Sequence, residues 1–180
     1  AHNTIKLIHT LLYPSFEMAV DDDIIRRNPA KDTLKDYGKP AEERVALTVA
    51  QQEKLLAFAR QSRIYRKRLP MLQVMLGLSC RCGELIGLTW QDVDMERRQV
   101  SIGSQLIYKD YGDGYRFHLS APKTAAGIRT IPMSDTVYEA FAEQKRQNFL
   151  LGIPRNVEVE ERSDYIFTSK NGRPLMPNAI

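Results

Sequence analysis

The sequence predicts an α+β fold, in which helices pack against a small antiparallel β-sheet. Apolar residues recur at helical spacing over residues 1–28 and again over residues 48–88, which indicates amphipathic helices. Three strand-like segments follow over residues 99–133, separated by the turn sequences Gly112-Asp113-Gly114 and Ala125-Ala126-Gly127. Strands joined by turns this short pair in antiparallel fashion, and their separation from the helices along the chain is typical of the α+β class.

The first 28 residues contain one predicted helix, with Thr4 as its N-cap, whose periodicity fades after Ile25 and which ends at Asn28-Pro29. Pro14 falls inside the apolar pattern, which predicts a kink or a new helix start there. A single helix cannot bury its own apolar stripe, so we expect residues 1–28 to be the last part of a helical domain whose beginning is absent. Residues 29–44 are polar and typical of a linker, which leaves residues 45–180 as the second domain.

The second domain contains predicted helices, then strands, then a last helix. Thr48-Val-Ala-Gln51 is a capping box, Pro70 is a favoured first-turn residue, and Ser134 is an N-cap. These signals and the apolar spacing predict helices over Thr48–Ser62, Pro70–Leu78, Arg81–Leu88 and Ser134–Gly152, and strands over Gln99–Ile107, Tyr115–Ser120 and Ile128–Met133. Pro177 would begin a further helix, so we expect the chain to be cut at both ends.

Composition excludes several classes of protein. Of 180 residues, 43% are hydrophobic and 27% are charged, which is typical of a globular protein and not of a disordered or collagen-like chain. No apolar run is long enough for a membrane span, and no secretory signal opens the chain. Cys80 and Cys82 are one residue apart and cannot staple the fold, so two free thiols favour a reducing, cytoplasmic compartment.

The net charge of +4 is small, but five cations gather in one stretch without an acidic residue. They are Arg60, Arg63, Arg66, Lys67 and Arg68. A phosphate backbone attracts such a cluster, which makes it a candidate DNA-binding surface. The alternative is a solvated helix end, where cations are favoured by the helix dipole.

Metal and cofactor chemistry find no support in the sequence. None of the three histidines (His2, His9 and His118) has a second ligand at metal spacing, and we expect no metal site. The sequence contains no Walker loop, no dinucleotide-binding glycine motif and no nucleophile elbow, so we expect no cofactor.

Two segments remain as candidates for chemistry. The first contains Arg81-x-x-Glu84-Leu85 and continues to Leu-Thr-Trp-x-Asp-x-Asp at residues 88–94, and the second contains Pro122-Lys123-Thr124 followed by Arg129-Thr-Ile-Pro. This ordered series resembles the tyrosine recombinases, and among them the integrases of phages and conjugative transposons. Residues 1–28 look like the last helix of that family's core-binding domain. The sequence departs from the family at Leu78-Ser79, where Thr-Gly is usual.

The resemblance implies site-specific recombination of a mobile element through a covalent 3′-phosphotyrosine intermediate. Arg81 matches the family's first catalytic arginine, which holds the charge on the phosphate oxygens. Lys123 matches the hairpin lysine that protonates the leaving 5′-oxygen, and Glu84 would orient Arg81. Arg129 either touches a phosphate or faces solvent. Without the family, Arg81 and Glu84 would be an ordinary surface pair and Lys123 a solvated turn residue.

The family's remaining catalytic residues, a His-x-x-Arg segment and the nucleophilic tyrosine, have no match in the 180 residues. We interpret Tyr165 as a packing residue and expect the chain to be an inactive fragment of the catalytic domain. The implied partners are double-stranded DNA attachment sites and, on DNA, further copies of the full-length protein. The alternative is a catalytically inert DNA-binding or architectural protein; a metal-dependent nuclease lacks ligands.

Overall fold

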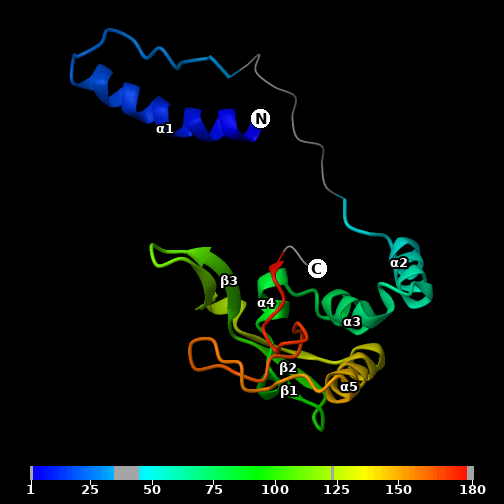
Figure 1. The fold of residues 1–180 in the computed structure, drawn as a ribbon. Coiled ribbons are helices and arrows are strands. Elements are labelled where there is room, and N and C mark those ends of the chain that lie inside the picture. The colour runs from blue at the N-terminus through cyan, green and yellow to red at the C-terminus, as the bar shows by residue number, and fades with distance from the viewer. Residues whose placement is uncertain (1, 35–44, 123, 178–180) are drawn as a thin grey trace. The chain divides into compact units, whose positions relative to one another are not determined.

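The computed structural model describes residues 2–34, 45–122 and 124–177 (Figure 1). The chain divides into two compact units, residues 1–47 and residues 48–180, and each is described here by itself. None of the helices in the described ranges has both the length and the hydrophobicity that crossing a membrane requires.

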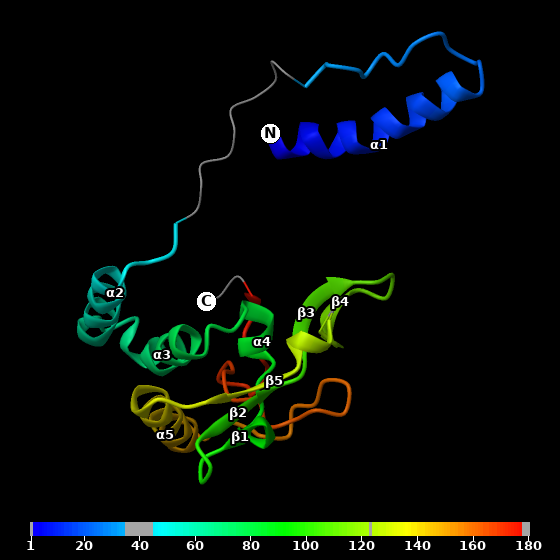
Figure 2. The same ribbon diagram turned by 180° about the vertical axis from the view of Figure 1, so that it is seen from behind.

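The first unit is a helix and the segment that folds back on it. Helix α1 (His2–Asp21) is continuous through Pro14, so no new helix begins there. Its axis bends near the middle in both ribbon views, which agrees with the other predicted outcome, a kink (Figures 1 and 2). Thr4 lies inside this helix and is not its N-cap. The helix leaves much of its apolar surface open, through Ile5, Leu7, Ile8, Leu11, Leu12 and Met18.

Asn28 holds the segment after α1 against the helix. Its side-chain amide donates to the carbonyl oxygen of Tyr13 at 3.0 Å and to the carboxylate of Glu17 at 2.6 Å. Its Oδ1 accepts from the backbone N–H of Ala30 at 2.8 Å. Because Asn28 is buried, these bonds satisfy a polar side chain that would otherwise be costly to remove from water.

In the described part of the second unit, three α-helices precede the strands and one follows them. They are α2 (Val49–Gln61), α3 (Leu69–Leu78), α4 (Cys82–Ile86) and α5 (Asp135–Leu150), with a 3₁₀ turn η1 (Arg66–Arg68) between α2 and α3. Thr48 caps α2 in the predicted capping box, and the Ser134 hydroxyl caps α5. The predicted helix over Arg81–Leu88 is shorter in the structure, because α4 ends at Ile86 and a 3₁₀ turn η2 (Trp90–Asp92) begins soon after.

The strands form two separate antiparallel sheets. One has the order β1-β2-β5, from β1 (Val93–Asp94), β2 (Gln99–Ile102) and β5 (Arg129–Pro132), and the other pairs β3 (Gln105–Asp110) with β4 (Tyr115–Ser120). The single strand predicted over Gln99–Ile107 is therefore wrong. The chain breaks at residues 103–104, so that β2 joins one sheet and β3 begins a hairpin that projects from the unit in both ribbon views (Figures 1 and 2).

The main core lies between α3, α5 and the three-stranded sheet. Val74 on α3, Val100 on β2, and Val137 and Phe141 on α5 are all buried in one cluster. A second, smaller cluster joins Ile86, Leu106 and Tyr165. These clusters fix α4 between the core and the hairpin, and this helix places two predicted site residues, Arg81 at its N-cap and Glu84 in its first turn.

Close packing and a special backbone conformation place the start of α4. A Cβ atom on Gly83 would lie 2.9 Å from the carbonyl oxygen of Leu106, so only glycine lets α4 approach β3 this closely. Ser79, where the sequence departs from the recombinase pattern, has φ 49° and ψ 35°. This left-handed conformation ends α3 in the way that glycine usually does, and it costs a serine some strain.

Candidate functional site

The buried carboxylate of Glu84 is the centre of the candidate site. Arg81 is the N-cap of α4, and its backbone N–H donates to Glu84 Oε2 at 2.9 Å. Glu84 thus satisfies one of the free N–H groups at the helix start, as the third residue of a helix often does. Its side chain is only 4% exposed.

Two arginines that are far apart in the sequence share this carboxylate. Arg81 Nη1 donates to Glu84 Oε1 at 3.0 Å. Arg129, on β5, donates from Nη2 to Oε2 at 2.8 Å and from Nη1 to Oε1 at 3.4 Å. Such charge-assisted bonds to both oxygens fix the plane of the carboxylate.

The electrostatics follow from this geometry. Hydrogen bonds from Arg129, and then from Arg81, lower the pKa of Glu84 to about 2, against the opposing effect of burial. The bond to Glu84 in turn raises the pKa of Arg129. Burial, and after it the charge of Glu84, raises the pKa of the neighbouring Cys80 thiol to about 11. At neutral pH the cluster therefore contains two guanidinium groups, one carboxylate and a neutral thiol.

The two arginines differ in what they offer to a ligand. The side chain of Arg81 is 76% exposed, and within the described residues only its Nη1 has an acceptor. Arg129 is 29% exposed, and its Nη1 also donates to the carbonyl oxygen of Gly127 at 3.1 Å. Arg81 can therefore present several N–H donors to an anion, whereas Arg129 is turned toward protein acceptors.

Lys123 lies outside the described residues, but the loop on either side of it is described. The N–H of Gly127 donates to the carbonyl oxygen of Thr124 at 2.9 Å. A Cβ on Gly127 would come 2.4 Å from Pro122 Cβ, so Pro122 packs directly on that glycine. The loop is thus closed on Gly127, whose carbonyl binds Arg129.

The predicted basic cluster occupies the end of α2 and the turn η1. Arg60, Arg63, Arg66 and Lys67 are exposed and Arg68 is half-buried. Phe58 and Tyr65, also on this surface, contact each other with ring centroids 5.9 Å apart. Exposed cations beside aromatic rings suit a nucleic-acid surface, and a solvated helix end would have the same cations.

The structure contains a second arginine–carboxylate cluster that the sequence did not predict. Arg162 binds Asp92, and its guanidinium also donates to Thr89 Oγ1 at 3.0 Å and to Ser104 Oγ at 2.6 Å. Asp92 Oδ2 accepts from the N–H of Thr89 at 2.8 Å, so Asp92 also shapes the turn before the sheet. Arg162 follows Asp92 by 70 residues and lies in a polar segment. No pattern in the sequence indicates that the two residues pair.

Tyr165 is buried in the smaller core cluster and contacts Ile86 and Leu106 there. Its hydroxyl donates to the carbonyl oxygen of Val159 at 3.4 Å. Burial raises its pKa to about 12, so the hydroxyl stays protonated at neutral pH. These observations confirm the interpretation of Tyr165 as a packing residue.

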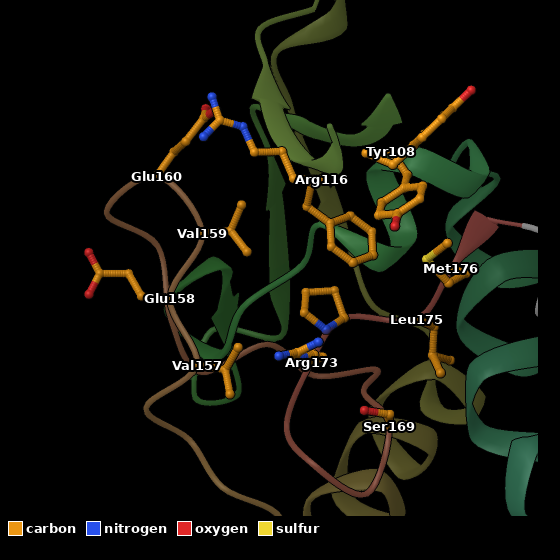
Figure 3. Close-up of a pocket in the computed structure, with 13 residues that line it drawn as sticks. Tyr108, Arg116, Val157, Glu158, Val159, Glu160, Ser169, Arg173, Leu175 and Met176 are labelled. Carbon is orange, nitrogen blue, oxygen red and sulfur yellow. The ribbon is translucent and has the colours of Figure 1, made fainter. Parts of the chain in front are cut away.

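A cavity of about 790 Å³ lies away from the arginine–carboxylate site. It opens between β4 and residues 157–176, with Tyr108, Leu175 and Met176 on one side and Glu158 and Glu160 on the other (Figure 3). None of Arg81, Glu84 and Arg129 lines it. The described residues contain no group of three or more His, Cys, Asp and Glu side chains that could hold a metal ion.

Comparison with known proteins places this geometry in context. The profile described as "Phage integrase family" matches residues 46–180. The transposase from transposon Tn916 of Enterococcus faecalis is 35% identical over 97% of this chain, and a probable integrase of prophage ps2 from Lactococcus lactis is 32% identical over 92%.

Among solved structures, the Tn1549 transposon integrase in complex with a circular intermediate DNA superposes with a TM-score of 0.79. It is 32% identical to this chain, covering 96% of it and 53% of the integrase. The chain spans 42% of the length of the Tn916 transposase and 44% of that of the ps2 integrase.

Proposed function

Because the chain belongs to the phage integrase family, we propose that it is the first part of a tyrosine recombinase catalytic domain, preceded by a piece of the core-binding domain. In this proposal residues 1–28 end the core-binding domain, residues 29–44 are the linker, and residues 45–180 begin the catalytic domain. The full-length protein would integrate or excise a mobile element through a 3′-phosphotyrosine intermediate. The Tn1549 integrase, whose structures are complexes with transposon DNA, supports this activity.

The observation that carries the proposal is the orientation of Arg81 by a buried carboxylate. Glu84 fixes one edge of an exposed guanidinium, and the free N–H groups remain for the oxygens of a DNA phosphate. Donors held in place before the reaction stabilise charge that develops in the transition state. Arg81 would therefore be a catalytic residue and Glu84 a positioning residue.

Lys123 would supply the proton that the leaving 5′-oxygen needs. Its neighbours Pro122 and Thr124 both contact Gly127, and Gly127 binds Arg129 through its carbonyl. This chain of contacts links the loop to the Arg81–Glu84 pair and supports a lysine acting on the same phosphate. An ammonium group on a loop is a suitable general acid, because it can approach and leave the phosphate.

The basic cluster would bind the DNA backbone. Five cations on adjacent turns of the surface give an attraction that does not depend on base sequence. The partners proposed for the full-length protein are double-stranded attachment sites and further copies of itself on DNA, as in the λ integrase dimer and tetramer structures on DNA. Its compartment would be the cytoplasm.

Replacing the bridging 5′-oxygen of the scissile phosphate with sulfur tests the division of roles in the full-length protein. A thiolate leaves without a proton, so Lys123→Ala, expected to slow oxygen-substrate cleavage by about 10²–10⁴-fold, should recover on the sulfur substrate. Arg81→Ala should not recover, since it lacks a donor to the phosphate oxygens. Failure of sulfur to rescue Lys123→Ala would remove Lys123 from the role of acid.

The isolated chain is proposed to form no covalent adduct, since its sequence has no His-x-x-Arg segment and Tyr165 is buried. Incubation with a nicked suicide duplex and denaturing electrophoresis test this. An adduct that maps to Tyr165 would overturn it. If the full-length protein also forms no adduct but binds DNA, the alternative of an inert DNA-binding protein is favoured.

A further inference from the structure

The proposed recombinase chemistry assigns no role to Arg129, although its side chain makes specific contacts. Its guanidinium donates to Glu84 Oε2 at 2.8 Å and to the Gly127 carbonyl at 3.1 Å. These acceptors belong to the protein, and the side chain is mostly buried. Both terminal nitrogens of Arg129 already donate to protein acceptors, so a role toward Glu84 explains its position better than a direct contact with DNA.

The charges in the cluster explain the position of Arg129 better than a contact with DNA does. Glu84 is buried and ionised, and a buried carboxylate needs a partner charge. If Arg81 were the sole partner, the pair would be neutral and Arg81 would have little net charge left for an anion. With Arg129 as a second partner, two guanidinium groups share one carboxylate, and the cluster has a net charge of about +1.

Among the residues that the structure describes, few groups act on Glu84. Arg81 reaches it from the start of α4 and Arg129 from β5, and both lower its pKa. Cys80, between α3 and α4, is a neutral thiol. Within the described residues, removal of Arg129 therefore leaves Arg81 as the cation that compensates Glu84.

From this arrangement we propose that Arg129 is a positioning residue that compensates the charge of Glu84, so that Glu84 can orient Arg81 without neutralising it. The inference rests on the proposed function, in which Arg81 binds a phosphate. It assigns Arg129 an indirect electrostatic role in place of a DNA contact. A mere structural anchor would hold β5 to α4 equally well but would have no effect on the charge at Arg81.

The test uses the chain itself, with inorganic phosphate as the probe. Nuclear magnetic resonance of ¹⁵N-labelled arginine side chains follows the Arg81 Nε–H signal during a phosphate titration at pH 7. Arg129→Met should weaken phosphate binding at Arg81 about tenfold, the effect of one unit charge nearby at the protein surface. Arg129→Lys keeps the charge and should stay within about threefold of the wild type.

The double variant Arg129→Met/Glu84→Gln separates charge balance from anchoring. With the carboxylate gone, no compensating charge is needed, and phosphate affinity should return to within about threefold of the wild type. If the double variant binds phosphate no better than Arg129→Met, the proposal is overturned. If Arg129→Met does not fold, the double variant decides alone, and a tenfold loss in it overturns the proposal.

Arg146→Met is the matched control. Arg146 also donates to a carboxylate through two nitrogens, to Glu143 at 2.7 and 2.8 Å, but both residues lie on the exposed side of α5. Its removal should leave the Arg81 signal and its phosphate response unchanged.

The pKa of Glu84, followed by ¹³C resonance in the same samples, tests the charge balance without phosphate. It should rise in Arg129→Met and not in Arg146→Met, and an unchanged value overturns the proposal. Absence of any phosphate response at Arg81 in the wild type would instead reject Arg81 as the phosphate ligand, while the Glu84 titration still decides the role of Arg129.

Discussion

Two arginine–carboxylate clusters lie in the same unit and have opposite designs. In one, Glu84 binds Arg81 and Arg129 and leaves Arg81 largely exposed. In the other, Arg162 binds Asp92, Thr89 and Ser104, with 23% of its side chain exposed. Each carboxylate also accepts a backbone N–H at the start of a helical turn.

The difference lies in how many donors remain free. The Arg162 guanidinium uses both terminal nitrogens on protein acceptors, so this closed cluster ties residue 162 to the turn before β1 and to the residue before β3. Arg81 uses one nitrogen and keeps the others, so the Glu84 cluster is open. Similar chemistry therefore uses both terminal nitrogens of the guanidinium on the protein in one place and leaves N–H donors exposed in the other.

The largest expected effect comes from removing Arg81, the exposed arginine of the Glu84 cluster. In the full-length protein Arg81→Ala should slow DNA cleavage by about 10²–10³-fold, because one oriented donor to the transition state is lost. The melting temperature should change little, since the side chain is exposed. Cleavage of a suicide duplex gives the rate. The control Arg97→Ala, another exposed arginine in an i,i+3 pair, should cleave normally.

Removing Arg162 should have the converse effect, on stability. Arg162→Met leaves Asp92 half-buried without its cation and should lower the free energy of unfolding by about 2–3 kcal/mol in urea titrations. Arg155→Met, in the more exposed pair with Asp164, should cost less than about 1 kcal/mol. Equal losses from the two variants would show that the closed cluster is no more than a surface pair.

The free energy of unfolding at acidic pH should depend on Glu84, the carboxylate of the open cluster. The folded-state pKa of Glu84 is lowered to about 2 from 4.5, so its stabilisation is present above about pH 4.5 and is lost as pH falls toward 2. Exposure of Arg81 screens the effect, which leaves about 1–2 kcal/mol. Glu84→Gln should flatten stability between pH 2 and 5 relative to the wild type in urea titrations. A slope unchanged by Glu84→Gln would contradict the lowered pKa.

Much of the fold was predictable because the signals are local. The capping box at Thr48, the N-cap at Ser134 and the strand over Tyr115–Ser120 depend on neighbouring residues, and the structure confirms all three. The break between β2 and β3 was not predictable in this way. Residues 99–107 have a continuous strand pattern, and only their pairing with different partners, β5 and β4, separates them.

The site divides along the same line. The spacing of Arg81, the N-cap of α4, and Glu84 in its first turn is a local property, and the pattern indicated their pairing. Arg129 and Arg162 reach their carboxylates over 45 and 70 residues of sequence, through the sheet register and the packing of a long segment. A single sequence contains no periodic signal for such contacts, so the inward orientation of Arg129 was missed.

The smallest expected effect is on the salt dependence of DNA binding, which directly compares the exposed Arg81 with the protein-bound Arg162. Each cation that neutralises a DNA phosphate contributes about −0.9 to the slope of log Kobs against log salt concentration on duplex DNA. The chain should bind a duplex weakly, with affinity that falls steeply as salt rises, because the cations of residues 60–68 are available. Arg81→Ala should reduce the magnitude of this slope by about one.

Arg162→Met is the control, measured under conditions where the variant is folded. It should leave the slope unchanged, because the guanidinium of Arg162 is bound to the protein in the wild type. Equal slopes for wild type and Arg81→Ala would mean that the exposed guanidinium does not reach a phosphate, and the distinction between the two clusters would then be structural alone.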